Sequence, residues 1–140
     1  KPRLELIPWD VVHISDRDLP SLVGAARMWW LRETEQLPCL VPSDMVMGVG
    51  AVLAFGAVKY VARGWEDDSK YHTASSHFGS IMRHVMVPGP DAESGLDAQW
   101  HAACRYMMLS ALLARGDLID DRPPARAGAQ TVAMSRGGEA

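Results

Sequence analysis

The sequence contains few cysteines and no surplus of positive charge. Only Cys39 and Cys104 occur in its 140 residues, and Cys104 stands in a strongly apolar stretch. A disulfide framework is therefore not expected, and a reducing cytoplasm is the default compartment. Lys and Arg number 14 against 17 Asp and Glu, which gives a formal net charge of −3 and a pI near 5.9. This balance argues against a protein that binds nucleic-acid polymers through counterion release.

Sequence features that define several large protein classes are also missing. No apolar signal core follows Lys1-Pro2-Arg3, and no apolar run has the length of a membrane span. The chain has no phosphate loop of the Walker type, no G-x-S-x-G elbow and no paired C-x-x-C. These absences exclude the corresponding enzyme classes and predict no membrane partner. A small anionic ligand bound through a metal ion remains open.

Apolar residues recur at helical spacing, and no segment alternates apolar and polar residues long enough to propose a sheet. Prolines predict an extended or turn-like segment over residues 1–14, and 117–140 carry no periodic pattern. The sequence therefore predicts an all-α fold, one domain over 1–116 followed by an irregular tail. We expect a bundle of about four helices, with a polar loop over about 64–73 and helices over about 15–36, 44–63, 74–87 and 95–115.

Capping residues mark the expected helix ends. Ser15, with Asp18 three positions on, can cap the first helix, and Ser43 or Asp44 the next. Pro38 and Pro42 are expected to end the first helix, and Gly116 the last.

The second expected helix contains three glycines, which are costly in a helix interior. Gly48, Gly50 and Gly56 therefore suggest that another helix or a ligand approaches the backbone closely. In the first helix Trp29 and Trp30 are adjacent and face different directions, so at most one is fully in the core. The other is expected at a subunit interface or over a nucleobase.

Two carboxylates and two histidines flank the last helical hairpin. Asp91 and Glu93 lie in a loop bounded by Pro and Gly, where oxygen ligands can converge on a divalent cation. His77 and His84 share a helix face, so that one or both can meet His101 on the next helix. The alternative for His101 is a structural hydrogen bond in which Asp97 orients its ring. Asp97, His101 and Arg105 follow one another at i, i+4 and i+8.

A second group of candidate residues ends the glycine-bearing helix. Lys59 and Arg63 can contact phosphate oxygens, and the indole of Trp65 can stack on a base or sugar. Alternatively, the two cations only complement the helix dipole. Glu66 lies in an acidic run that either is solvated or supports the site.

Five pieces of sequence resemble one known family. They are Lys1–Pro8, Ala54–Tyr60 with Gly64-Trp65, Arg83-His84, Asp91–Leu96 and His101–Cys104. In this order they resemble the dATP/dGTP diphosphohydrolase N-terminal domain of phages, a MazG-like group of all-α nucleotide pyrophosphohydrolases. The resemblance covers residues 1–8 and about 44–115, and 9–43 resembles an insertion relative to shorter members.

The resemblance implies hydrolysis of a purine deoxynucleoside triphosphate, with dGTP favoured and dATP as the alternative, to the monophosphate and pyrophosphate with Mg²⁺ or Mn²⁺. The chain is also similar to the MazG-like enzyme of phages that replace adenine by 2-aminoadenine. If a phage encodes the chain, the resemblance implies an enzyme that supplies or cleanses the nucleotide pool for phage DNA synthesis in the host cytoplasm. The same resemblance implies that the enzyme forms a homodimer or homotetramer. The substrate would be bound by Arg3, Lys59, Tyr60, Arg63 and Trp65.

One departure from the family pattern affects the metal ligands. The helical E-E-x-x-E and the later E-x-x-D of the wider MazG group are absent here. We therefore predict Asp91 and Glu93 as catalytic residues, and these two with His84 and His101 as metal ligands. Two other functions stay open: a non-catalytic helical interaction module of a phage, and a phosphohydrolase that releases a single phosphate or triphosphate.

Overall fold

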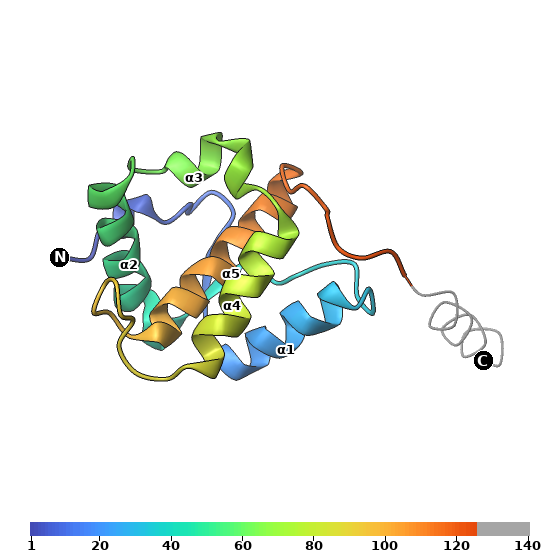
Figure 1. The fold of residues 1–140 in the computed structure, drawn as a ribbon, viewed down its shortest axis with the longest axis horizontal. Coiled ribbons are helices and arrows are strands. Elements are labelled where there is room, and N and C mark those ends of the chain that lie inside the picture. Colours follow the sequence, from blue (N-terminus) through green and yellow to red (C-terminus); the bar gives the residue numbers. More distant parts are fainter. Residues whose placement is uncertain (126–140) are drawn as a thin grey trace.

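A computed structural model describes residues 1–125, which form a helical bundle (Figure 1). The prediction of an all-α class is confirmed, with five α-helices, three 3-10 turns and one small sheet in this part of the chain. The helices are α1 (Leu19–Trp30), α2 (Val46–Lys59), α3 (Gly64–Asp67), α4 (Ala74–Met86) and α5 (Ala98–Arg115), the 3-10 turns η1 (Leu4–Leu6), η2 (Ser43–Met45) and η3 (Ser69–Tyr71), and the strands β1 (His13–Ser15) and β2 (Leu40–Pro42).

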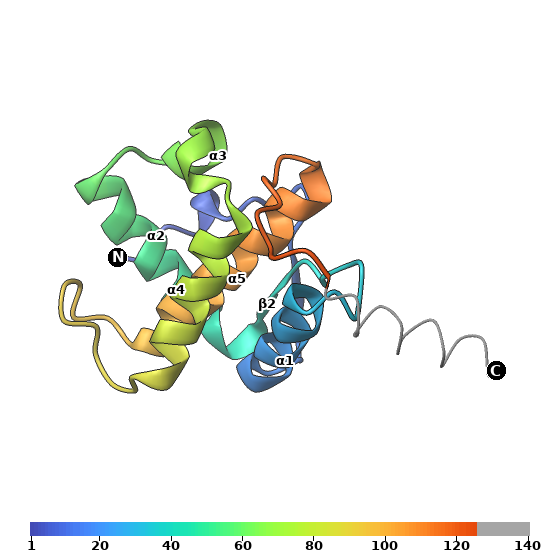
Figure 2. The same ribbon diagram turned by 45° about the vertical axis from the view of Figure 1, so that its right-hand side comes forward.

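Helix α5 lies at the centre of the bundle. Both ribbon views show α4 running along it, with α1 and α2 on different sides (Figures 1 and 2). Small and large apolar side chains of α5 are fully buried around much of its circumference, as expected for a central helix. No helix among residues 1–125 is long and apolar enough to cross a membrane.

Helix α1 is shorter than the predicted 15–36. The Asp18 side chain, not that of Ser15, caps it by accepting a hydrogen bond from the Ser21 N–H at 2.9 Å. Arg32 adopts a left-handed conformation with φ 63°, and Glu33 N–H donates to Met28 O at 2.8 Å. This local C-terminal motif ends the helix well before Pro38.

The expectation that the chain forms no sheet is wrong. His13–Ser15 pairs in parallel with Leu40–Pro42, and α1 connects the two strands. Each strand has three residues, too few to show an alternating pattern. Strand β2 is buried along its length, which hides the pattern further.

Two glycines of α2 admit close neighbours, as predicted. A Cβ at Gly48 would lie 2.4 Å from the Trp100 ring, and one at Gly50 would meet Leu4 at 2.7 Å. The N-terminal segment is docked there, because the Arg3 N–H donates to Gly50 O at 3.0 Å and Leu6 is buried in the core.

The other predicted helix ends need corrections. Neither Ser43 nor Asp44 caps α2 with its side chain; both belong to the turn η2 that precedes it. Helix α2 stops at Lys59, and the predicted loop of 64–73 contains α3 and η3. The last helix begins at Ala98 and ends, as predicted, at Gly116, whose φ is 75°.

Residues 117–125 pack against α1 and α4. Ile119 bridges to Thr73, and the Asp121 carboxylate accepts the Ser75 N–H at 2.8 Å, at the first turn of α4. The Arg122 guanidinium lies 3.8 Å from the ring centre of buried Trp29. The predicted tail therefore begins with an irregular but docked segment; 126–140 lie outside the described residues.

The adjacent tryptophans of α1 face different directions, as predicted. Trp29 is buried, whereas Trp30 is half-buried and stacks on Phe78 of α4 with ring centres 4.5 Å apart.

Candidate active site

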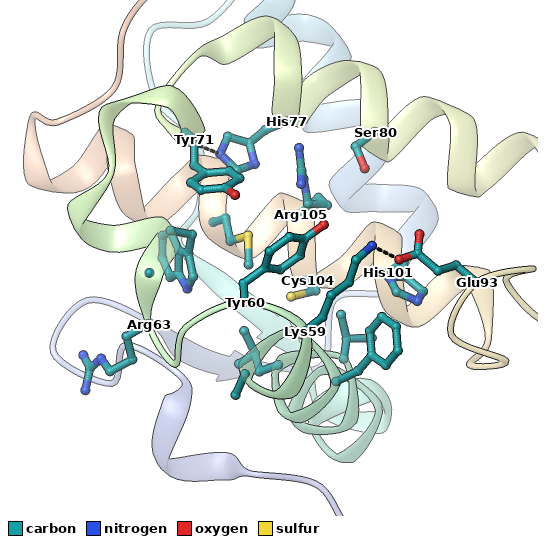
Figure 3. A pocket seen from close by; sticks show the side chains of 18 of the residues that line it. Lys59, Tyr60, Arg63, Tyr71, His77, Ser80, Glu93, His101, Cys104 and Arg105 are labelled. Carbon is teal, nitrogen blue, oxygen red and sulfur yellow. Dashed lines mark hydrogen bonds and ion pairs between the residues drawn. The ribbon is translucent and has the colours of Figure 1, made fainter.

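A cavity of about 280 Å³ opens between α2, α3, α4 and the start of α5 (Figure 3). Eight of the nine predicted site residues line it: Lys59, Tyr60, Arg63, Trp65, His84, Asp91, Glu93 and His101. The exception is Arg3, which pairs with Glu5 at 3.2 Å and does not line the cavity. Elements distant in sequence thus bring together the candidates of α2, of α4 and of the loop of residues 91–95, which we call the acidic loop.

The acidic loop is shaped by Asp91. Its carboxylate accepts the N–H groups of Glu93 at 3.1 Å and Ser94 at 2.9 Å, and its carbonyl accepts that of Gly95. Gly95 has φ 72°, a left-handed conformation that glycine adopts without strain. The N–H of Ser94 is the main cause that lowers the pKa of Asp91. The carboxylate is therefore ionised at neutral pH.

Two imidazoles stack beside this loop. The rings of His84 and His101 lie 4.9 Å apart between centres, which confirms that a histidine of α4 meets His101. The Ser94 hydroxyl lies 2.7 Å from His101 Nε2, and Asp91 Oδ2 lies 3.9 Å from it. Burial lowers the pKa of both histidines, so both are neutral at pH 7.

The alternative in which Asp97 orients His101 is wrong. The Asp97 side chain accepts the Gln99 N–H at 2.9 Å and caps α5 instead. Because an N-cap side chain turns back toward the first helical turn, it cannot also serve the residue four positions later.

Lys59, the last residue of α2, and Arg63, which precedes α3, have different partners. Lys59 forms an ion pair with Glu93, which joins α2 to the acidic loop. The Arg63 side chain points away from the other labelled residues in Figure 3 and binds Glu66 at 2.6 Å. Glu66 also binds Arg115 of α5 at 2.6 Å and is therefore not a solvated charge. Lys59 is the better placed of the two cations to meet a ligand.

The inner wall of the cavity carries polar residues that sequence reasoning did not assign to the site. His77 is fully buried, and its Nε2 lies 2.6 Å from Tyr71 O, while Nδ1 has no partner. Burial lowers the pKa of His77 to about 3, so the ring is neutral and Nε2 carries the donated hydrogen. Nδ1 is consequently an acceptor, and Ser80 and Arg105 line the same wall.

A sequence signal for Arg105 did exist: it is the one charge between Ala98 and Leu113 of the buried helix α5. Cys104, its neighbour, also lines the cavity. Burial raises the pKa of that thiol to about 12, so it stays protonated and is a poor nucleophile.

The four predicted metal ligands do not converge as a ready set. Among residues 1–125, no group of three or more His, Cys, Asp or Glu side chains is placed to hold an ion. Asp91 and Glu93 nevertheless fit the way Mg²⁺ is often bound, through one or two carboxylates with water and substrate phosphates supplying the other oxygens. A cation here would depend on the substrate for part of its coordination.

The family model described as dATP/dGTP diphosphohydrolase, N-terminal, matches residues 32–122. This range includes every cavity-lining residue and excludes the N-terminal piece Lys1–Pro8. No curated protein and no solved structure matches the chain.

Proposed function

The chain belongs to the dATP/dGTP diphosphohydrolase N-terminal family, and from this membership we propose that its cavity hydrolyses a purine deoxynucleoside triphosphate to the monophosphate and pyrophosphate. The observation that carries the proposal is the single cavity in which cations, carboxylates, neutral imidazoles and aromatic rings meet. Such a combination suits a phosphorylated ligand with an aromatic base.

The lining divides into a charged and an aromatic part. Lys59, Asp91 and Glu93 lie where phosphates and a cation would be held, while the buried Trp65 and the half-buried Tyr71 bring aromatic rings to the cavity wall, where a base could contact them. We therefore propose that the phosphates bind at the charged end of the cavity and the base at its aromatic end.

In the proposed reaction, side chains of the protein move the proton and bind the leaving group, and a divalent ion assists them. Mg²⁺ or Mn²⁺, held by Asp91 and Glu93 together with phosphate oxygens, would neutralise phosphate charge and polarise the phosphorus. Neutral His101 can accept a proton from the water that attacks the α phosphorus in line, and Ser94 holds its ring. Lys59 can stabilise the negative charge of the departing pyrophosphate once it leaves Glu93.

A second copy of the chain is proposed to complete the site. Val58, in the last turn of α2, and Tyr60 and Val61, just after it, are largely exposed, and Tyr60 and Val61 also line the cavity. The cavity is small for a nucleoside triphosphate. An apolar partner surface at this edge would cover both the exposed side chains and part of the ligand.

The deciding experiment is product analysis with the full chain. Each deoxynucleoside triphosphate is incubated with Mn²⁺ or Mg²⁺, and products are separated by chromatography. We expect monophosphate and pyrophosphate from a purine substrate. Asp91→Asn should lower turnover by about a hundredfold or more, because the change keeps the shape and removes the charge.

Asp97→Asn is the matched control, because Asp97 caps α5 and lies outside the cavity lining. Its turnover should stay near that of the native chain. Release of a single phosphate or of triphosphate would indicate the other phosphohydrolase reaction. If no deoxynucleotide is hydrolysed or stabilises the fold with any divalent ion, the non-catalytic interaction module is the better interpretation.

A further inference from the structure

Arg105 is half-buried, and its guanidinium is incompletely hydrogen-bonded. One guanidinium nitrogen donates to Ser76 O at 3.1 Å and to Ser76 Oγ at 3.0 Å. Its Nε is shielded from solvent and has no hydrogen-bond partner. Within residues 1–125 the guanidinium forms no ion pair with a carboxylate, in contrast to Arg63, Arg115 and Arg122. A positive charge therefore lies in the wall of the cavity with only the neutral Ser76 as its hydrogen-bond partner.

Such a charge is costly unless an anion compensates it. Moving a guanidinium even partly out of water without a counterion carries a desolvation penalty. Burial accordingly lowers the pKa of Arg105 from its usual value. The Ser76 contacts offset only part of this penalty, because Nε remains unpartnered.

The surroundings of Arg105 are suited to receiving an anion. The residue lines the cavity, and in Figure 3 its side chain lies between those of His77 and Ser80, with the Tyr60 hydroxyl directed toward the same space. Ser80 can donate a second hydrogen bond, and Lys59 supplies a second positive charge on the facing helix α2. The carboxylates of this cavity belong to the acidic loop, where Glu93 pairs with Lys59.

We propose that Arg105 is the phosphate-binding residue of the inner wall, with Nε–H donated to an oxygen of a phosphate group. The planar guanidinium can engage two oxygens of one tetrahedral anion, which a lysine cannot do. The identity of the anion as a nucleotide phosphate rests on the proposed function. The anion site itself depends only on the half-buried guanidinium, whose Nε has no hydrogen-bond partner.

The test uses inorganic pyrophosphate with the full chain in EDTA, so that neither a metal nor hydrolysis contributes. Pyrophosphate should raise the Tm of the native chain in a concentration-dependent way. Arg105→Gln should weaken pyrophosphate binding by about ten- to a hundredfold, the size of one or two lost charge-assisted hydrogen bonds. Arg27→Gln removes one positive charge on the exposed side of α1 and should bind as the native chain does.

A second measurement covers the case in which Arg105→Gln does not fold. In the native chain the ¹⁵N–H resonance of Arg105 Nε should shift on pyrophosphate addition, and Arg105→Lys should bind more weakly while keeping the charge. Unchanged affinity in a folded Arg105 variant, or an Nε resonance that pyrophosphate does not move, would overturn the proposal. If pyrophosphate binds through Arg105 but no nucleotide is hydrolysed, the anion site stands and the proposed reaction fails.

Discussion

At the scale of single residues, the cavity is lined by imidazoles that stay neutral because they are buried. The pKa of His77 is lowered to about 3, and those of His84 and His101 are lowered as well. In the unfolded chain each would take up a proton near pH 6.5. The unfolded state therefore binds more protons than the folded state below that pH. Stability is highest above pH 6.5 and falls as the pH decreases from there toward the folded pKa values.

This predicts a specific effect of His77→Gln. The glutamine amide can still donate to Tyr71 O but cannot be protonated. The native chain should lose a few kcal/mol of unfolding free energy between about pH 7 and pH 4.5, and the variant should lose clearly less. The pKa of Asp120 is lowered to about 2, so this carboxylate changes the unfolding free energy only at pH values below this range.

Urea unfolding at a series of pH values measures this difference. His13→Gln, the same exchange at an exposed histidine of β1, controls for the loss of an imidazole as such. An equal pH dependence for His77→Gln and the native chain would show that His77 does not carry the effect.

Residue types and motifs predicted eight of the residues that line the cavity but not the partners of each side chain. The loop residues Asp91 and Glu93 and the histidines of two helices reach one cavity because α4 packs along α5. Which carboxylate caps a helix and which faces the cavity depends on where α5 begins, at Ala98. The predicted start of this helix, at about residue 95, is three residues earlier than the observed one, and this shift changes Asp97 from a residue inside the helix to its N-cap. The hydrophobic pattern of one sequence does not define a helix start to within three residues.

At the scale of elements, helix α2 contains glycines with opposite surroundings. A Cβ at Gly48 would collide with the Trp100 ring at 2.4 Å, whereas a Cβ at Gly56 would meet nothing within 4 Å. The same residue type is thus required at one position and tolerated at the other. The helix can approach α5 closely at Gly48 and stays open beside the cavity at Gly56.

Gly48→Ala and Gly56→Ala are therefore predicted to change stability in opposite directions. The first should lower the unfolding free energy by about 1–3 kcal/mol through overpacking against Trp100. The second should raise it by about 0.8–1 kcal/mol, the helix propensity gained over glycine. Denaturant titration of both variants measures the two values, and effects of equal sign would contradict the placement of α2 against α5.

Helical periodicity located four of the helices, and their ends were set by interactions that a pattern does not show. The end of α1 depends on a left-handed Arg32, a conformation more typical of glycine. The parallel pair β1 and β2 depends on contacts between segments separated by α1. The helix end is a local motif built on a residue other than glycine, and the strand pair arises from tertiary packing, so neither has a signal in the hydrophobic pattern.

At the scale of the whole molecule, the segment 117–125 joins two helices. Asp121 binds the first turn of α4 through the Ser75 N–H and hydroxyl, and Arg122 covers Trp29 of α1. The family match extends through this segment to residue 122. The sequence indicated only an irregular tail here, because a docked segment without periodicity has no local signature.

We predict that Asp121→Ala lowers the unfolding free energy by about 0.5–2 kcal/mol, as the loss of a helix cap does. Thermal or denaturant unfolding of the full chain measures the change. Asp117→Ala removes an exposed carboxylate from the same segment and should stay near the native value. Equal effects of the two variants would show that the contact with α4 does not stabilise the fold.

The position of Trp65 has a spectroscopic consequence. Five tryptophans lie in residues 1–125, and Trp65 alone lines the cavity, with its indole N–H buried and unpartnered. A chain in which Trp9, Trp30 and Trp100 are replaced by phenylalanine would emit from Trp65 and from Trp29, which lies beneath Arg122 on the other side of the bundle. A base stacked on the Trp65 indole would quench its fluorescence and leave that of Trp29 unchanged. Occupancy of the cavity could then be followed in solution without labelling the nucleotide and before any bond is broken.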